Sequence, residues 1–116
     1  MNEDTLSKID KEVKNNKIII YMKGTKDEPQ CGFSAAVVDV FKLLEVPFAT
    51  RDVLEDNELR EGIKKYSNWS TVPQVFIGGK FIGGCDITRE LYQSGELQKM
   101  VKEIVDYSAT TIPPVI

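Results

Sequence analysis

Cys31 opens the run Cys31-Gly32-Phe33-Ser34, in which a serine stands three residues after the thiol. In a Cys-x-x-Cys pair, the second sulfur can close a disulfide on the first and release a bound substrate. A serine hydroxyl cannot form that bond. A reactive Cys31 must therefore take its second sulfur from another molecule, or bind something jointly with that molecule.

The surroundings of Cys31 predict an acidic thiol. The residues that follow recur at helical spacing, which places Cys31 at a helix N-terminus, where unpaired N–H groups and the helix dipole favour the thiolate. Lys23, across the preceding loop, adds a positive charge. The alternative is an unreactive cysteine that fills space in the core. Because Cys31 follows a strand-to-helix turn and precedes Gly32, we expect its sulfur on the rim of the fold, as a nucleophile or a soft metal ligand.

Three further motifs allow either a structural or a ligand-binding role. Thr71-Val72-Pro73 precedes a predicted strand, and the residues alone favour a trans peptide bond before Pro73. Gly83-Gly84 is either the exit of a hairpin or a place where a ligand approaches the backbone closely. Asp86 is expected to cap the helix that follows it, which does not prevent contact with a ligand. Cys85 shares this ambiguity.

The hydrophobic pattern predicts the elements that position these motifs. A surface helix is expected at residues 4–15, with Asp4 as its N-cap. Further helices are expected at residues 32–44, at 56–68 with Asp56 as N-cap, at 86–91 and at 97–105. Strands are expected at Ile18–Met22, Pro47–Val53, Val75–Ile77 and Lys80–Ile82. The first strand is a continuous apolar run, which is typical of a central strand covered on both faces.

The order of these elements predicts an α/β fold. A helix crosses between the first two strands, so these strands should be parallel, whereas Gly78-Gly79 predicts a two-residue hairpin between the last two. The result is a four-stranded mixed sheet flanked by helices on both faces, in a thioredoxin-like order. We expect one domain over residues 1–107, and a loose tail over residues 108–116 that contains Pro113-Pro114.

Composition narrows the class of protein. A chain of 116 residues is long enough to bury a core without disulfides, and two scattered cysteines suit a reducing compartment. The acidic start and the absence of an apolar run of roughly 20 residues predict a soluble, intracellular protein with no membrane contact. We expect a bacterial cytoplasm, or a mitochondrial matrix if a presequence has been removed. The net charge of −3 argues against nucleic acid as a partner.

Four motifs in this order resemble those of a monothiol glutaredoxin of the CGFS class. They are Lys23-Gly24-Thr25, Pro29-Gln30-Cys31-Gly32-Phe33-Ser34, Trp69-Ser70-Thr71-Val72-Pro73-Gln74 and Gly83-Gly84-Cys85-Asp86. The resemblance covers about residues 5 to 105 and implies a thioredoxin-like fold, a groove for glutathione and a cis peptide bond before Pro73. The chain departs from many relatives in having Ser70 in place of proline and in lacking a proline among Lys26-Asp27-Glu28. Neither change removes an expected contact.

The resemblance also implies a set of glutathione-binding residues. They are Lys23, Arg60, Val72, Pro73, Gly84, Cys85 and Asp86. In the family, residues at the positions of Lys23 and Arg60 contact the glycyl carboxylate, and the N–H and C=O of the residue at Val72 meet the cysteinyl backbone as an added strand would. Cys85 and Asp86 would then hold the γ-glutamyl end.

The resemblance further implies a 2Fe-2S cluster shared between two chains. Such a cluster needs four ligands, commonly thiolates. Cys31 from each of two chains and two glutathione thiols make four. Cys85 as a second internal ligand is the weaker alternative, because in this family its position lines the γ-glutamyl pocket. Iron-sulfur acceptor apoproteins and BolA-like proteins are further partners that the resemblance suggests.

Three functions are consistent with the sequence. The first is a glutathione-dependent carrier that delivers 2Fe-2S clusters from a cluster-bridged homodimer to acceptor proteins. The second is an oxidoreductase in which Cys31 reduces protein-glutathione mixed disulfides. The third is an interaction module with an incidental thiol. The loop Thr25 to Gln30 is longer than in dithiol relatives, and in this class it is thought to reposition Lys23 and to slow the reaction with glutathione, which favours the carrier.

Overall fold

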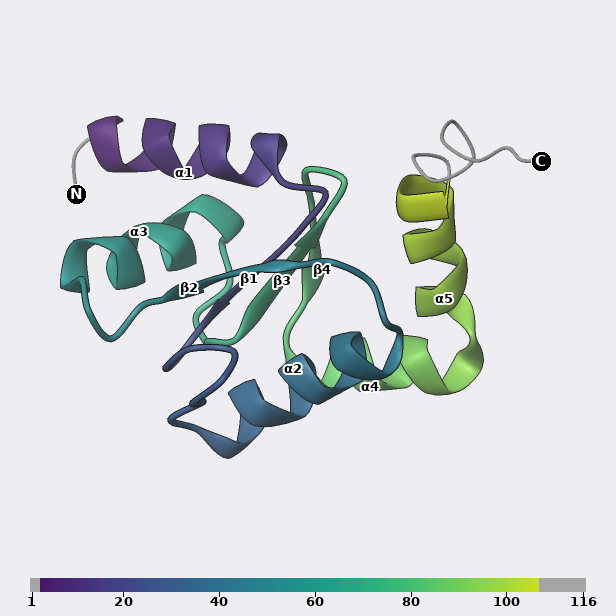
Figure 1. The fold of residues 1–116 in the computed structure, drawn as a ribbon. Coiled ribbons are helices and arrows are strands. Elements are labelled where there is room, and N and C mark those ends of the chain that lie inside the picture. Colours follow the sequence, from purple (N-terminus) through teal and green to yellow (C-terminus); the bar gives the residue numbers. More distant parts are fainter. Residues whose placement is uncertain (1–2, 107–116) are drawn as a thin grey trace.

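The computed structural model describes residues 3–106 (Figure 1). In chain order its elements are α1 (Glu3–Asn15), β1 (Ile18–Met22), α2 (Gly32–Leu43), β2 (Ala49–Asp52), α3 (Asn57–Ser67), β3 (Gln74–Ile77), β4 (Lys80–Gly83), α4 (Cys85–Ser94), α5 (Glu96–Val101) and a π-helical turn, η1 (Lys102–Asp106). The predicted tail, residues 108–116, lies outside the described residues.

The four strands form one mixed sheet in the order β2-β1-β3-β4. Strand β1 is parallel to β2 and antiparallel to β3, and β3 is antiparallel to β4. All five residues of β1 are buried, as a central strand requires. The turn between β3 and β4 is made by Gly78 and Gly79, whose φ angles of 61° and 82° are readily adopted by glycine. The predicted parallel pair, central first strand and hairpin are therefore confirmed.

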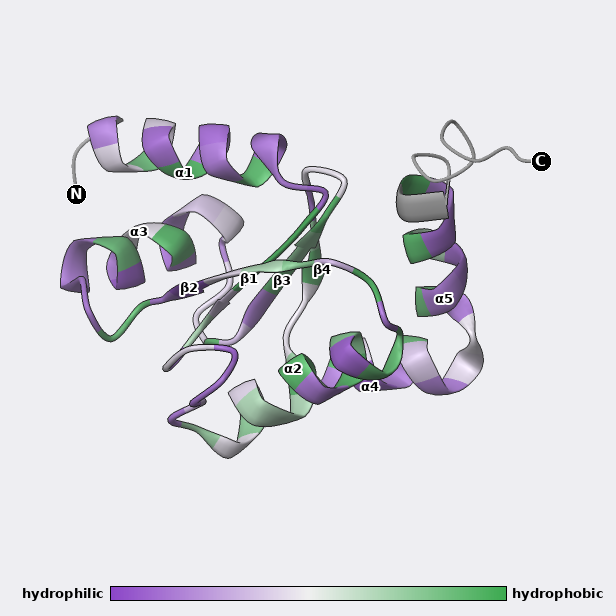
Figure 2. Cartoon of the chain, viewed as in Figure 1, coloured by the Kyte–Doolittle hydropathy of each residue, from purple (hydrophilic) through white to green (hydrophobic). Residues whose placement is uncertain are grey.

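Helices cover both faces of the sheet, as expected. Helices α1 and α3 lie on one face, and α2, α4 and α5 lie on the other (Figure 1). Side chains of β1 alternate between two cores, so that Ile18 and Ile20 pack towards α2 whereas Ile19 and Tyr21 pack towards α1 and α3. Figure 2 shows the apolar stripes of α1 and α2 turned towards the sheet.

Helix α1 is tied to the rest of the fold through its polar side as well as its apolar side. Ile9 and Val13 are buried, whereas the other described side chains of α1 are exposed or half-buried, so α1 is a surface helix packed on the sheet, as expected. The hydroxyl of the buried Tyr21 donates to the Glu12 carboxylate at 2.5 Å. The hydroxyl of Tyr66 on α3 donates to Asp10 at 2.7 Å.

Two of the predicted N-caps are wrong and one is confirmed. Asp56 caps α3, because its side chain accepts hydrogen bonds from the N–H groups of the second and third helical residues. Asp4 instead lies inside α1. Asp86 lies in the first turn of α4, because the carbonyl of Gly84 already accepts the first helical bond from the Thr88 N–H at 3.0 Å. Gly84 is thus the N-cap and gives α4 no side-chain cap.

The last predicted helix is divided. α5 ends at Val101 and continues as the π-helical turn η1, so the single amphipathic helix expected over residues 97–105 is only partly correct. None of the helices within residues 3–106 has the length and apolar composition needed to cross a membrane.

Candidate functional site

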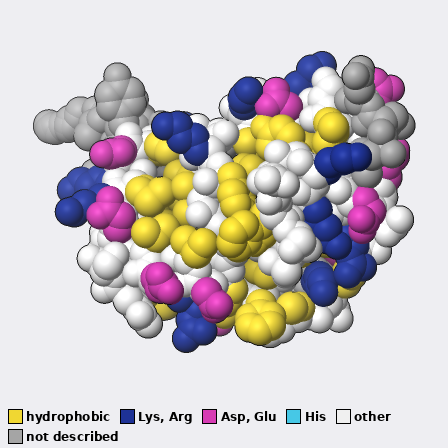
Figure 3. Space-filling view, turned by 180° about the vertical axis from the view of Figure 1, so that it is seen from behind, with side chains coloured by type: hydrophobic (Ala, Val, Ile, Leu, Met, Phe, Trp, Pro, Cys, Tyr) yellow, Lys and Arg dark blue, Asp and Glu magenta, His cyan; other side chains and the backbone are white. Residues whose placement is uncertain are grey.

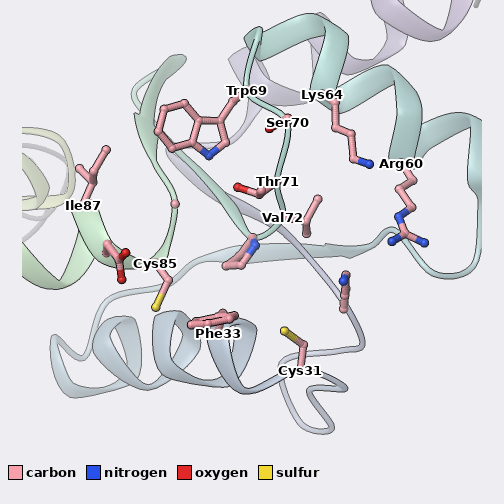
Figure 4. A pocket seen from close by; sticks show the side chains of 14 residues that line it. Cys31, Phe33, Arg60, Lys64, Trp69, Ser70, Thr71, Val72, Cys85 and Ile87 are labelled. Carbon is pink, nitrogen blue, oxygen red and sulfur yellow. The ribbon is translucent and has the colours of Figure 1, made fainter.

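A cavity of about 610 Å³ lies between the start of α2, the loop after α3 and the start of α4 (Figure 4). Every site residue predicted from the sequence lines it, namely Lys23, Cys31, Arg60, Val72, Pro73, Gly84, Cys85 and Asp86. The fold thus brings together motifs that are far apart in the chain. Figure 3 shows the molecule from behind the view of Figure 1. Hydrophobic side chains gather at the centre of this face, and several basic side chains lie on the side where α1 and α3 are.

Cys31 is the N-cap residue of α2, and its side chain is partly exposed at the cavity. The pKa of its thiol is lowered, chiefly because the main-chain N–H of Ser34 hydrogen-bonds the sulfur. The N–H of Phe33, the Ser34 hydroxyl and the charge of Lys23 act in the same direction, whereas partial burial opposes them. The predicted acidic thiol on the rim of the fold is therefore confirmed.

Ser34, which occupies the position of the absent second sulfur, has a role of its own. Its side chain is fully buried, and its oxygen accepts a hydrogen bond from the Lys23 N–H at 3.1 Å. A hydroxyl can accept one hydrogen bond and donate another, and the Ser34 hydroxyl also hydrogen-bonds the Cys31 sulfur. Ser34 therefore joins the end of β1 to the start of α2 and stabilises the thiolate.

The loop Thr25–Gln30 before Cys31 is held as a compact hairpin. Its Thr25 and Glu28 exchange main-chain hydrogen bonds of 3.2 and 3.1 Å. The Lys26 ammonium donates to the Phe48 carbonyl at 2.6 Å and lies 4.1 Å from the centre of the Phe48 ring. Gly24 begins the hairpin with a φ of 90°, and a Cβ there would lie 2.5 Å from main-chain atoms of the loop. The loop thus has a defined path between Lys23 and Cys31.

The opposite wall of the cavity is the loop from Trp69 to Val72, which ends in a cis peptide bond between Val72 and Pro73. The trans bond favoured by the residues alone is therefore wrong, and the cis bond implied by the resemblance is confirmed. Trp69 also packs against Phe81, with ring centres 5.5 Å apart, so it has a packing role as well as a place in the wall.

Backbone geometry and close contacts within the chain explain why both residues, Gly83 and Gly84, are glycine. Gly83 has a φ of 149°, and a Cβ there would lie 2.8 Å from Ile87. A Cβ on Gly84 would lie 3.2 Å from the Pro73 carbonyl oxygen and 3.4 Å from the Trp69 Nε1. The close backbone approach at Gly84 is therefore an approach of the Pro73 loop, and it fixes the start of α4 beside the cavity.

The charges around the cavity make its local field positive. Lys23, Arg60 and Lys64 line it, and Asp86 is the one carboxylate among the described lining residues. Lys64 lies 3.6 Å from Glu61, which leaves the ammonium only loosely paired. The Nε of Arg60 is buried and has no hydrogen-bond partner within residues 3–106. An acidic chain thus presents a cationic cavity, which suits an anionic ligand.

Six lining residues were not among the predicted site residues. They are Phe33, Lys64, Trp69, Ser70, Thr71 and Ile87. Lys64 could have been found, because it follows Arg60 by one helical turn and therefore lies on the same face of α3. The 63% exposure of Phe33 could not have been predicted, because the sequence places Phe33 in an otherwise apolar helix.

Metal ligands are sparse in the described part of the chain. Cys31 and Cys85 are both free thiols. Within residues 3–106, no three histidine, cysteine, aspartate or glutamate side chains come together in an arrangement that could hold a metal ion.

Comparison with known proteins gives a consistent family. Residues 18–82 match the family model described as Glutaredoxin. The chain is 56% identical over 102 residues to a Synechocystis protein named uncharacterized monothiol glutaredoxin ycf64-like, which covers 88% of this chain and 95% of that protein. Further similar proteins named monothiol glutaredoxin come from Rickettsia, from rice chloroplasts and from Arabidopsis mitochondria.

Solved structures agree with this result. The solution structure of reduced poplar apo GrxS14 is similar with a TM-score of 0.75 and 52% identity, covering 84% of this chain and 90% of that one. The crystal structure of a buckwheat glutaredoxin-glutathione complex is similar with a TM-score of 0.79 and 28% identity, covering 90% of this chain and 96% of that one.

Proposed function

The chain belongs to the glutaredoxin family, in its monothiol class and with its thioredoxin-like fold, and from that premise we propose that it is a glutathione-dependent carrier of 2Fe-2S clusters. In this proposal, two copies of the chain bridge one cluster and deliver it to acceptor apoproteins. The observation that carries it is the single acidic thiol of Cys31, which opens onto a cationic cavity while Ser34 stands where a second sulfur would be.

The cavity suits glutathione at both ends. Glutathione is a tripeptide with two carboxylates, one ammonium and one thiol. Lys23 and Arg60 supply cations for one carboxylate, and the uncapped N–H groups at the start of α4 suit the other. Asp86, exposed in the first turn of α4, is available for the ammonium. The buckwheat relative, whose structure is named as a glutathione complex, supports this assignment.

The ligand count supports a cluster shared between chains. A 2Fe-2S cluster needs four ligands, and the described part of one chain has no cluster of side chains that could supply them. Cys31 from two chains and the thiols of two glutathione molecules complete the set. Two ligands then come from a small molecule that exchanges freely, so the cluster can leave without unfolding of the protein.

An oxidoreductase is the second candidate, because it needs the same cavity. The Cys31 thiolate would attack the glutathione sulfur of a protein-glutathione disulfide and release the protein thiolate. A second glutathione thiolate would then attack the Cys31 mixed disulfide, giving glutathione disulfide and free Cys31. The hairpin at Thr25–Gln30 favours the carrier. Its hydrogen bonds give the long loop between Lys23 and Cys31 a fixed path, and this long loop is the feature that favours the carrier over the oxidoreductase.

Anaerobic reconstitution with iron and sulfide salts, with and without glutathione, tests the proposal. Absorption spectroscopy and size-exclusion chromatography should show cluster bands and a dimer only when glutathione is present. Cys31→Ser should lose both signals. Cys85→Ser keeps the main chain at the start of α4, where the γ-glutamyl end would bind, so it should keep both signals and serves as the control for removal of a thiol.

Two results would overturn parts of the proposal. Failure of the native chain to gain cluster absorption and to dimerise, together with rapid turnover of a glutathionylated substrate, would replace the carrier by the oxidoreductase. Loss of the cluster in Cys85→Ser with glutathione affinity intact would make Cys85 an iron ligand and reject the shared-thiol arrangement.

A further inference from the structure

The first residue of β3, Gln74, has a buried amide that points away from the ladder of the sheet. Its side chain is completely buried, although glutamine is usually exposed. The side-chain Nε2 donates to two main-chain carbonyls, that of Trp69 at 3.0 Å and that of Thr71 at 3.1 Å. One NH2 group has two donors, so both are used in holding a single loop.

That loop is the wall of the cavity opposite Cys31. It carries Trp69, Ser70, Thr71 and Val72, all of which line the cavity. Figure 4 shows Trp69, Thr71 and Val72 across the cavity from Cys31 and Phe33. No other side chain of residues 3–106 hydrogen-bonds the main chain of residues 70–72. The path of this wall therefore depends on Gln74.

Burying the side-chain amide of Gln74 is energetically unfavourable. The Oε1 of Gln74 is buried and has no hydrogen-bond partner within residues 3–106. A buried polar atom without a partner is unfavourable, and an apolar side chain of similar length would avoid it. Packing alone thus does not account for glutamine at this position, whereas two donors aimed at the loop carbonyls do.

We propose that Gln74 is a positioning residue for ligand binding, which sets the wall from Trp69 to Val72 so that the main-chain groups of Val72 meet the ligand. This inference rests on the proposed binding of glutathione in the cavity. Gln74 acts through the loop and touches no ligand itself, since it is not among the residues that line the cavity. The electrostatics of Cys31 are separate, because they come from Ser34, Phe33 and Lys23.

Gln74→Met tests the inference, because methionine keeps the length of the side chain and removes both donors. We expect glutathione to bind this variant about tenfold more weakly by isothermal titration calorimetry, at a temperature where the variant is fully folded. The rate of Cys31 alkylation as a function of pH should match that of the native chain. A residue that only stabilised the fold would lower the melting temperature and leave the affinity of the folded protein unchanged.

Gln98→Met is the matched control. The Gln98 side chain, on α5, also donates to a main-chain carbonyl, that of Tyr92 in the last turn of α4 at 3.2 Å, and neither residue lines the cavity. This variant should bind glutathione as the native chain does. In NMR spectra, the single indole N–H signal of Trp69, the one tryptophan of the chain, should move in Gln74→Met and stay in Gln98→Met.

The outcomes separate this inference from the proposed function. If the native chain binds glutathione and Gln74→Met binds it within twofold, Gln74 is not a positioning residue. A shifted pH profile of Cys31 alkylation in Gln74→Met would also reject the inference, because it would show a general disturbance of the site. If the native chain does not bind glutathione, the proposed function fails and this inference fails with it.

A native-state measurement remains decisive if Gln74→Met does not fold. The side-chain amide protons of Gln74 should exchange with solvent far more slowly than those of Gln98, which is exposed, and glutathione should slow them further. Equal exchange rates for the two amides would overturn the inference.

Discussion

At the scale of single residues, the acidity of Cys31 is the property on which the chemistry depends, and it has a measurable source in Ser34. Ser34→Ala removes the hydroxyl that hydrogen-bonds the sulfur but keeps the helix N–H groups. In a Cys85→Ser background, the midpoint of Cys31 alkylation against pH should lie below that of an ordinary thiol and should rise in Ser34→Ala. Thr88→Val, which removes another fully buried hydroxyl from α4, should leave the midpoint unchanged.

The same shift makes the stability of the fold depend on pH. The pKa of Cys31 is lower in the folded state than in the unfolded chain, so the folded protein loses this proton first as the pH rises. The stabilisation is complete above the unfolded pKa and is lost as the pH falls through the folded pKa. Urea unfolding of the native chain and of Cys31→Ser at several pH values measures this difference. A difference independent of pH would contradict the lowered pKa.

Lys64 is a second residue whose contribution can be isolated. It lines the cavity, whereas its exposed neighbour Lys65 does not. Lys64→Gln should weaken glutathione binding about 1.4- to fivefold, because a partly exposed ion pair contributes roughly 0.2–1 kcal/mol. Lys65→Gln removes the same charge from the chain and should change the affinity little. Equal effects of both variants in calorimetry would assign the effect to net charge and not to the cavity.

At the scale of elements, two tyrosine hydroxyls attach α1 to the sheet and to α3. Tyr21→Phe keeps the edge-to-face contact with Phe76 and removes the bond to Glu12. Burial raises the pKa of Tyr21, so its hydroxyl remains a donor across the accessible pH range. A hydrogen bond to a charged group contributes about 1.5–3 kcal/mol, which is the expected loss of unfolding free energy in urea titrations.

Tyr66→Phe provides the comparison for this prediction. Tyr66 is less buried than Tyr21, and its acceptor Asp10 keeps a salt bridge with Lys14 at 3.0 Å. The loss of unfolding free energy should therefore be smaller than in Tyr21→Phe, on the order of 1 kcal/mol. Neither variant should alter glutathione affinity, because neither tyrosine lines the cavity and no described residue of α1 does. A reversed order of the two losses would reject this account of how α1 is held.

The elements themselves were largely predictable, because their signals are local. The apolar run Ile18–Met22 is typical of a covered strand, and Gly78-Gly79 is typical of a tight turn between two strands. The caps were less predictable. Asp86 has the right residue type for a cap, but the position of Gly84 against the Pro73 loop decides where α4 begins, and that contact is tertiary.

The site was predicted where it depends on motifs and missed where it depends on packing. Cys31, Val72 and Asp86 belong to short runs that resemble a known family, so their positions could be identified before the fold was known. Gln74 gave no signal of its own beyond membership of such a run. Its role depends on burial and on two carbonyls in a loop whose path is fixed only in three dimensions.

At the scale of the whole molecule, charge acts in opposite directions on the two binding events of the proposed function. Glutathione, an anion, meets a cavity lined by three cations and one carboxylate, whereas the chain as a whole carries a net charge of −3. Salt screens both interactions. Raising the salt concentration from about 20 to 150 mM should therefore weaken the binding of glutathione to the single chain.

The assembly of two chains around a cluster should respond in the opposite sense. Two copies with a net charge of −3 each repel one another, so screening should favour the dimer when glutathione is held at a saturating concentration. Analytical ultracentrifugation of the cluster-loaded protein at the two salt concentrations measures the dimer fraction, and calorimetry of the cluster-free chain measures the affinity for glutathione. A dimer that dissociates as salt rises, at saturating glutathione, would show that complementary ion pairs between the chains outweigh their overall repulsion.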